Sequence, residues 1–170
     1  MVNLELCFKT ACEQAQLIRN KKISVTQLIT AHLDQIERLN PTLNAIVTLT
    51  AESALEEAQA ADAALAKQAP LGALHGLPVA HKDLFLTKGV RTTFGSPIYQ
   101  DFIPEHDSLP VERLKKAGAI SLGASTKGNV LLNYTGLTGD YIESIGEVNP
   151  YKYGRFTPGS NIPIRPEALS

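Results

Sequence analysis

The sequence predicts an α/β layered fold. Along the first 123 residues, stretches with helical periodicity alternate with short apolar stretches rich in β-branched residues. A length of 170 residues, of which 44% are hydrophobic, suits one globular domain with a buried core. After Gly123 glycines and prolines are frequent and no period is sustained. We therefore expect the C-terminal ~45 residues to be largely irregular.

Two amphipathic helices are predicted near the N-terminus. The stretches 10–20 and 24–39 both repeat apolar residues at helical spacing. Ser24 followed three residues later by Gln27 is a capping-box pattern, which favours a helix start at this point. Pro41 is expected to stop the second helix, because proline has no amide hydrogen to continue the bonding.

Strands and helices then alternate. The β-branched stretch 44–50 predicts a strand, and Thr50 is expected to cap an alanine-rich helix over residues 51–68. Short buried strands are predicted at 77–80 and 119–122.

The last predicted helix lies between these two short strands. Ser108 is its expected N-cap, and Pro110 falls in its first turn, where proline is tolerated. Gly118 is expected to end the helix.

The charge balance argues against nucleic acid and membrane partners. There are 16 Lys and Arg residues against 17 Asp and Glu residues, a net charge of −1, so no basic surface draws the chain to phosphates or anionic lipids. No stretch approaches the length of a membrane span, and the first ten residues carry Glu5 and Lys9, where a signal peptide is apolar. We expect a cytoplasmic protein.

Cysteine and histidine patterns do not predict a metal site or a disulfide. Cys7 and Cys12 point in different directions on a helix, and both are expected to be small apolar core residues. The four histidines show no metal-binding spacing.

Lys82 is the first candidate for chemistry. It follows a predicted buried strand, where burial disfavours an ammonium group, and a neutral lysine can take a proton from a hydroxyl nucleophile. The alternative is a surface ion pair with Asp83 or another carboxylate. Two further segments allow two interpretations each: residues 91–96 present hydroxyls to a ligand or form a turn, and the turn at 157–161 exposes Ser160 with or without a function.

Three segments together resemble the N-terminal part of the amidase-signature family. They are LNPTLNAIVTLT, LGALHGLPVAHKDLFLTKGVRTTFGS and DSLPVERLKKAGAISLG, in this order, and the resemblance covers residues 5–123. It implies helices layered on a mixed β-sheet, and hydrolysis of carbon–nitrogen amide bonds by a Ser-Ser-Lys triad. Lys82 matches the base of that triad. The implied substrate is a small-molecule amide, and the implied mechanism needs neither a metal nor an organic cofactor.

The resemblance weakens after Gly123, so we divide the chain into an N-terminal portion of an amidase domain, 1–123, and a divergent, loop-rich tail, 124–170. Ser160 is the candidate relay serine, but Asn161-Ile162-Pro163 stands where the family has Ser-Gly-Gly. The family's nucleophile lies further downstream, and the serine that follows Ser160 here is Ser170. We therefore expect a truncated, inactive fragment.

Two other functions are compatible with the same sequence. The catalytic subunit of glutamine-dependent tRNA amidotransferases shares the lysine motif and the fold. A non-catalytic partner-binding protein, or half of a split enzyme, would instead use the helices at 10–39 as a docking surface. Free apolar faces on these helices would favour the second alternative, and faces packed on the sheet would oppose it. The sequence predicts no oligomeric state.

Overall fold

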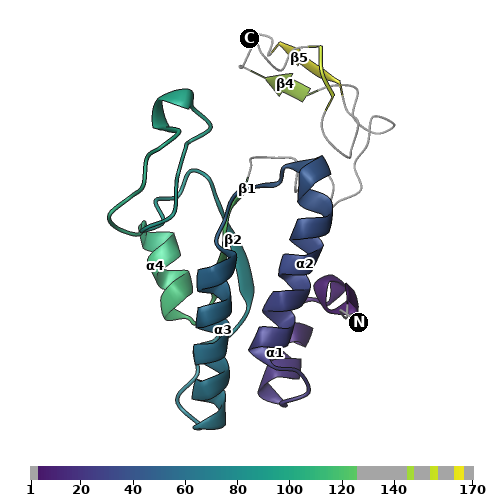
Figure 1. Ribbon diagram of the computed structural model, residues 1–170, viewed down its shortest axis with the longest axis vertical. Helices are drawn as coiled ribbons and strands as arrows, with labels where there is room; N and C mark the ends of the chain where they lie inside the picture. The colour runs from purple at the N-terminus through teal and green to yellow at the C-terminus, as the bar shows by residue number, and fades with distance from the viewer. Residues whose placement is uncertain (1–3, 126–144, 148–153, 157–162, 167–170) are drawn as a thin grey trace.

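The computed structural model describes residues 4–125, 145–147, 154–156 and 163–166 (Figure 1). In chain order the helical elements are η1 (Leu4–Phe8), α1 (Ala11–Arg19), α2 (Val25–Leu43), α3 (Ala51–Ala66), η2 (Pro97–Tyr99) and α4 (Leu109–Lys116). The strands are β1 (Ile46–Leu49), β2 (Pro78–Lys82), β3 (Ile120–Ser125), β4 (Ile145–Glu147) and β5 (Ile164–Pro166). The chain thus has the α/β character that the sequence predicts.

A mixed sheet of three strands, in the order β1-β3-β2, organises the N-terminal part. β3 lies in the centre, where it pairs antiparallel with β1 and parallel with β2. Gly123 of β3 has a φ of +125°, and a Cβ built on it would lie 1.9 Å from the carbonyl oxygen of Thr48. The close approach of β1 and β3 therefore requires glycine at this position.

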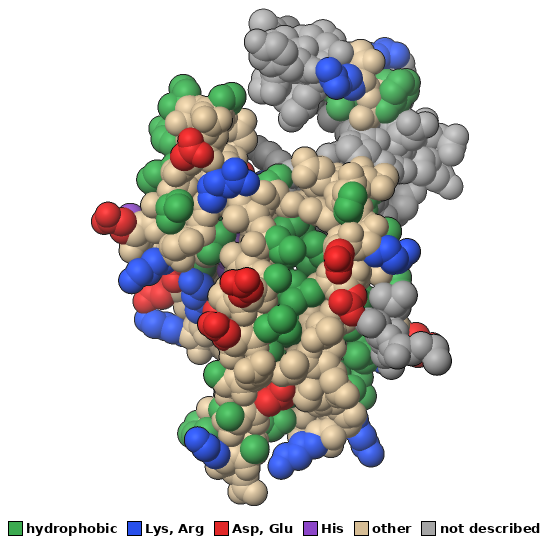
Figure 2. Space-filling model, in the orientation of Figure 1, with side chains coloured by type: hydrophobic (Ala, Val, Ile, Leu, Met, Phe, Trp, Pro, Cys, Tyr) green, Lys and Arg blue, Asp and Glu red, His purple; other side chains and the backbone are tan. Residues whose placement is uncertain are grey.

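The core lies between the sheet and the first three α-helices. Fully buried side chains of α1, α2 and α3 meet apolar side chains that lead into or lie on β2 and β3. The cluster contains Leu6, Ile18, Val25, Leu28, Ile29, Ala31, Ala54, Ala58, Leu77, Ile120 and Leu122. In Figure 1, α3 stands between α4 and α2, and Figure 2 shows hydrophobic side chains gathered where α2 and α3 meet. The amphipathic faces predicted at 10–39 are thus packed into this core.

The predicted capping box at the start of α2 is present. The Ser24 hydroxyl accepts the Gln27 N–H at 2.9 Å, and the Gln27 side chain accepts the Ser24 N–H at 2.9 Å. Asp62 of α3 adds a second cap, because its carboxylate accepts the backbone N–H groups of Val25 and Thr26 at 2.7 and 3.0 Å. The free N–H groups at the start of α2 are satisfied by side chains from two elements.

The prediction that α2 stops at Pro41 is wrong. α2 continues through Pro41 to Leu43 and ends on Asn44, which has a φ of +47°. Proline is tolerated here because it sits in the last turn, where its missing N–H leaves only the carbonyl of exposed Glu37 without a helical donor.

The predicted cap at Thr50 is also wrong. Its side chain makes no capping hydrogen bond to α3 and donates instead to the carbonyl oxygen of Ser121 at 3.1 Å. Its N–H donates to the carbonyl of Leu122. Thr50 therefore forms hydrogen bonds to β3 in place of the side-chain cap of α3.

Ser108 stands at the N-cap of α4, but its hydroxyl makes no capping bond. Its oxygen is buried without a hydrogen-bond partner among the described residues.

The two cysteines differ from the prediction that both belong to the core. Cys7 is half-buried against the core, and its thiol donates to the carbonyl of Ala31. Cys12 is exposed, because it lies on the solvent side of α1.

In the C-terminal part, β4 and β5 pair in parallel. The sequence did not predict these two three-residue strands.

Candidate active site

Lys82 lies at the carboxyl end of β2, next to the carboxyl end of β3. The two strands are parallel, and the register pairs Lys82 with Ser125. In α/β sheets the carboxyl ends of parallel strands are where ligands bind. Lys82 is half-buried, and none of the described residues forms a hydrogen bond or ion pair with its amine. The end of β2 therefore presents an amine that has no hydrogen-bond or ion-pair partner among the described residues.

The backbone on both sides of Lys82 is held firmly. The carbonyl oxygen of Lys82 accepts the N–H groups of Leu84 and Phe85, at 2.6 and 2.9 Å, which turns the chain sharply after the strand. The N–H of Asp83 donates to the carbonyl of Ser125 at 2.9 Å, and the Ser125 hydroxyl donates to the carbonyl of His81 at 3.2 Å. Lys82 thus projects from a fixed point of the sheet.

Asp83 does not pair with Lys82, and no other carboxylate among the described residues does, so within this part of the chain the surface ion pair considered from the sequence is absent. Asp83 is only 8% exposed. Its carboxylate accepts the backbone N–H of Thr93 at 2.7 Å and, in a short contact, the Thr93 hydroxyl. Thr93 follows ten residues later in the chain, and no local spacing rule connects these two positions.

Residues 84–107, here called the 84–107 loop, connect β2 to α4. The guanidinium of Arg91 in this loop donates to the carbonyl of Val47 at 2.9 Å and to the Thr48 hydroxyl at 3.3 Å. The register of β1 shifts between Ile46 and Thr48, so Arg91 satisfies a carbonyl at an irregularity of the edge strand. The loop is therefore fastened to β1 as well as to the end of β2.

Of the hydroxyls predicted at 91–96, that of Thr93 binds Asp83, and those of Thr92 and Ser96 make contacts within the loop. Thr92 is 1% exposed, and its hydroxyl donates to the carbonyl of Val90. The Ser96 hydroxyl accepts the N–H of Ile98 and caps η2. These contacts are those of a turn, and the binding of a ligand by these hydroxyls stays a prediction.

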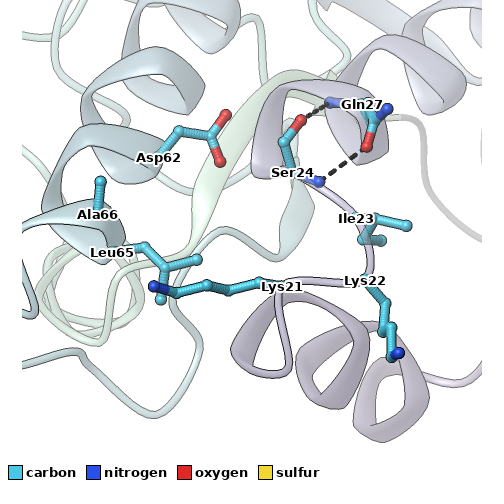
Figure 3. A pocket seen from close by; sticks show the side chains of 8 residues that line it. All are labelled: Lys21, Lys22, Ile23, Ser24, Gln27, Asp62, Leu65 and Ala66. Carbon is cyan, nitrogen blue, oxygen red and sulfur yellow. Dashed lines mark hydrogen bonds between the residues drawn. The ribbon is translucent and has the colours of Figure 1, made fainter.

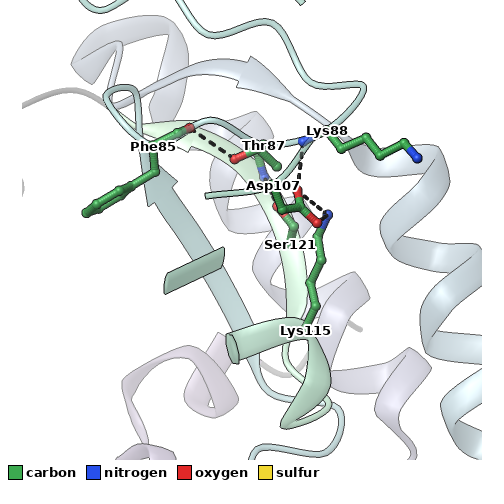
Figure 4. Close-up of polar contacts among 7 residues, drawn as sticks. Phe85, Thr87, Lys88, Asp107, Lys115 and Ser121 are labelled. Atoms are coloured by element: carbon green, nitrogen blue, oxygen red, sulfur yellow. Dashed lines mark hydrogen bonds and ion pairs between the residues drawn. The ribbon is translucent and has the colours of Figure 1, made fainter. Parts of the chain in front are cut away.

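An ion pair fastens the base of the same loop (Figure 4). Asp107 accepts the backbone N–H of Lys88 at 2.7 Å and pairs with the Lys115 ammonium at 2.9 Å. Partial burial alone raises the pKa of Asp107, but the hydrogen bonds from Lys115 and Lys88 outweigh it and leave this pKa below its ordinary value.

His81 faces this ion pair from the strand and is 5% exposed. Burial, and then the charge of Lys115, lower the pKa of His81, and Asp107 opposes them. Burial of the ring thus favours the neutral form of His81, which precedes Lys82 in β2.

Aromatic side chains cluster at the tip of the 84–107 loop. Phe94 lies 5.2 Å from Tyr99 in an edge-to-face contact and 6.1 Å from Phe102 in a stacked one, between ring centroids. All three remain partly exposed, as does Ile98 at 86%.

A hollow of about 360 Å³ lies elsewhere, at the start of α2 (Figure 3). Lys21 and Lys22 line it together with Ser24 and Asp62. Because Asp62 already occupies the helix N-terminus, this hollow offers no free N–H groups to an anion. Within the described residues no group of His, Cys, Asp and Glu is arranged to hold a metal ion.

Ser160, the predicted relay serine, lies outside the described residues, as does Ser170. Among the residues that the structure describes, no helix has the length and apolar character needed to cross a membrane.

Known proteins are similar to this chain in both sequence and fold. A family model described as Amidase matches residues 27–160. The chain belongs to the amidase family. It is 42% identical over 144 residues to a glutamyl-tRNA(Gln) amidotransferase subunit of Granulibacter bethesdensis, covering 84% of this chain and 28% of that protein. It is 50% identical over 114 residues to the same subunit of Azotobacter vinelandii, covering 67% and 23%.

Solved amidase structures agree with this assignment. The native peptide amidase of Stenotrophomonas maltophilia is similar with a TM-score of 0.67 and 26% identity, over 90% of this chain and 29% of that one. The fold of the described part is therefore an amidase-signature fold, as the sequence predicted. The chain spans about a quarter of the length of the curated amidase relatives it matches.

Proposed function

We propose that this chain serves in the hydrolysis of carbon–nitrogen amide bonds, with Lys82 as the catalytic base of a Ser-Ser-Lys triad. The observation that carries the proposal is the placement of Lys82: it ends a parallel strand, is half-buried, and has no partner among the described residues. The neighbouring carboxylate of Asp83 is bound to Thr93 instead. A base must keep a lone pair available for a proton, and an ion pair would remove it.

The proposed chemistry conserves protons at every step. The neutral Lys82 amine takes a proton from a relay serine, which takes one from the nucleophilic serine as its oxygen attacks the amide carbonyl. The C–N bond then breaks, and the proton returns to the leaving amine. Water hydrolyses the acyl ester, which releases the acid and restores the serine. Ser160 is the proposed relay serine, and a small-molecule amide is the proposed substrate.

A chimera tests the role of Lys82. Residues 5–123 replace the aligned segment of the Azotobacter vinelandii amidotransferase subunit, which is 50% identical over 114 residues. Ammonia or amine release from glutamine and from small anilides is then measured. We expect Lys82→Ala to reduce turnover by about 10²- to 10⁴-fold, the usual contribution of a general base.

Lys88→Ala is the matched control, because Lys88 lies in the same motif, is exposed, and contacts Asp107 only through its backbone. It should retain turnover within about twofold, since surface changes away from a site have small effects. An active Lys82→Ala chimera, or an inactive chimera with Lys82 intact, would contradict the proposal. The 170-residue chain assayed alone should show negligible turnover, because the family's nucleophile lies well downstream of the relay serine, and the serine that follows Ser160 within these residues is Ser170.

A second candidate is an amidotransferase-type role, in which the amide is that of glutamine. The identities of 42% and 50% to the two amidotransferase subunits favour it. The same chimera discriminates the two: preference for glutamine over anilides supports the amidotransferase role, and the reverse preference supports a general amidase.

The third alternative from the sequence, a docking surface on the helices at 10–39, loses its distinguishing feature. Ile18, Val25, Leu28 and Ile29 are completely buried in the chain's own core. We further propose a cytoplasmic location, which is compatible with two free cysteines.

A further inference from the structure

We infer that Thr93 is a positioning residue for Lys82: by holding the Asp83 carboxylate, it prevents this carboxylate from pairing with the amine of Lys82. The inference rests on the proposed role of Lys82 as a base and adds a device that keeps that base available. It concerns three residues that the fold brings to one end of β2.

The first step concerns charge. Asp83 is 8% exposed, and a carboxylate so deeply buried needs hydrogen-bond donors or a cation. Lys82 precedes Asp83 directly in the chain, and its long, flexible side chain makes its ammonium a candidate partner for that carboxylate. Other nearby cations are engaged or turned outward: Arg91 bonds to β1, and Lys88 is exposed.

The second step concerns geometry. Thr93 supplies two donors to Asp83, its backbone N–H and its hydroxyl. The Thr93 hydroxyl oxygen also accepts the N–H of Gly95 at 3.1 Å, which orients its hydrogen toward Asp83. Phe94 and Gly95 have φ values of +54° and +69°, so the loop folds back sharply behind Thr93. The left-handed conformation is costly for Phe94, which is not a glycine, and indicates that the surroundings enforce this turn.

The third step is the consequence for the base. Among the residues that the structure describes, Lys82 is an adjacent cation without a partner, with which a carboxylate released from Thr93 would pair. An opposite charge at this distance stabilises the protonated amine and withdraws it from proton transfer. Thr93 acts through Asp83 and does not itself touch the substrate.

The test measures the reactivity of the Lys82 amine in the 170-residue chain and needs no turnover. An amine-selective acetylating reagent is applied at pH 8.5, and peptide mass spectrometry gives the labelling rate of Lys82 relative to exposed, remote Lys67. In Thr93→Val the hydroxyl is lost and the backbone N–H is kept. We expect the relative rate at Lys82 to fall by about tenfold, the effect of one unscreened opposite charge.

Two control variants separate charge from structure. Thr93→Ser keeps the hydroxyl and should label at the wild-type rate. The double variant Asp83→Asn/Thr93→Val removes the released carboxylate and should restore the rate to within about twofold. Circular dichroism confirms folding of each variant. Should Thr93→Val not fold, Thr93→Cys, a weaker donor of similar size, should give a smaller decrease.

An unchanged or faster rate in Thr93→Val overturns the inference. So does a slow rate that persists in the double variant, because this result would mean a loosened loop rather than a released charge. Neither result bears on whether Lys82 is the base. An active Lys82→Ala chimera would show that Lys82 is not the catalytic base. The effect of Thr93 on the labelling rate of Lys82 would still hold.

Discussion

The carbonyl oxygen of Thr48 lies where a side chain at position 123 would have to begin: a Cβ on Gly123 would be 1.9 Å from it. Gly123→Ala should therefore force β1 and β3 apart, in addition to straining a φ of +125°. We expect the free energy of unfolding to fall by at least about 3 kcal/mol, measured by urea denaturation.

Gly89→Ala is the matched control for this variant, because Gly89 also has a positive φ of +74° but no atom within 4 Å of a built Cβ. It should cost about 1 kcal/mol, the strain of the left-handed conformation alone. Equal losses of unfolding free energy in the two variants would mean that the contact with Thr48 contributes nothing to the destabilisation.

Asp62→Ala should destabilise the start of α2. The variant leaves the N–H groups of Val25 and Thr26 and the Thr26 hydroxyl without their acceptor. Removing such a cap costs about 1–2 kcal/mol. Thermal and urea unfolding measure the loss, and Glu56→Ala, at an exposed position of the same helix, should change stability by less than about 0.5 kcal/mol.

Stability should decline as the pH falls below 6.5, in part because of His32. Burial lowers the pKa of His32 from its ordinary value of 6.5. Its Nε2 lies 3.3 Å from the Gln14 side-chain nitrogen, which donates to the carbonyl of Leu6, so a proton on this Nε2 would set two donors against each other.

The sign follows from proton linkage. Below pH 6.5 the unfolded chain binds a proton at His32 that the folded chain resists, so the contribution of His32 is complete above 6.5 and is lost at lower pH. His32→Gln should flatten the slope of stability against pH between 7 and 5, by at most about 1.4 kcal/mol per pH unit. The same substitution at exposed His106 should leave the slope unchanged, and an unaltered slope in His32→Gln would refute the argument.

Arg91→Ala should release the 84–107 loop from β1. Two hydrogen bonds to Val47 and Thr48 are lost, worth about 1 kcal/mol at an exposed site. Limited digestion with chymotrypsin, which cuts after aromatic residues such as Tyr99 in this loop, should become several-fold faster. Arg113→Ala removes an exposed arginine from α4 and should leave the digestion rate unaltered. If chymotrypsin digests Arg91→Ala no faster than the unchanged chain, contacts other than those of Arg91 hold the loop in place.

Local signals in the sequence predicted those features that depend on neighbouring residues. The capping box of Ser24 and Gln27 is one example, because both partners lie within one helical turn. The prediction that Pro41 ends α2 was wrong because helix-breaking rules apply to helix interiors, and Pro41 lies in the final turn of α2. Asn40, one residue earlier, exchanges two hydrogen bonds with the backbone of Ile46 and joins α2 to β1, which no helical periodicity predicts.

In the candidate site, too, features that depend on neighbouring residues were predictable, and features that depend on distant residues were not. The position of Lys82 at the end of a strand was predictable from the apolar residues before it. The partner of Asp83 was not, because Thr93 lies ten residues further along, in a loop whose turns at Gly89, Phe94 and Gly95 all use left-handed residues. Thr50 failed as a helix cap for a related reason: its preferred partner, the carbonyl of Ser121, is 71 residues away. Local preference predicts what a residue can do, and tertiary contacts select among these possibilities.

The strand order β1-β3-β2 also determines when the sheet can assemble. β3 is the last of the three to leave the ribosome, yet it is the only one of them that pairs with both others. β1 and β2 do not pair with each other, so no hairpin can start this sheet during synthesis. Such distant pairing makes folding slow. The arrangement around Lys82 therefore cannot form before residues 120–125 have been synthesised, because β2 pairs with β3 and not with β1.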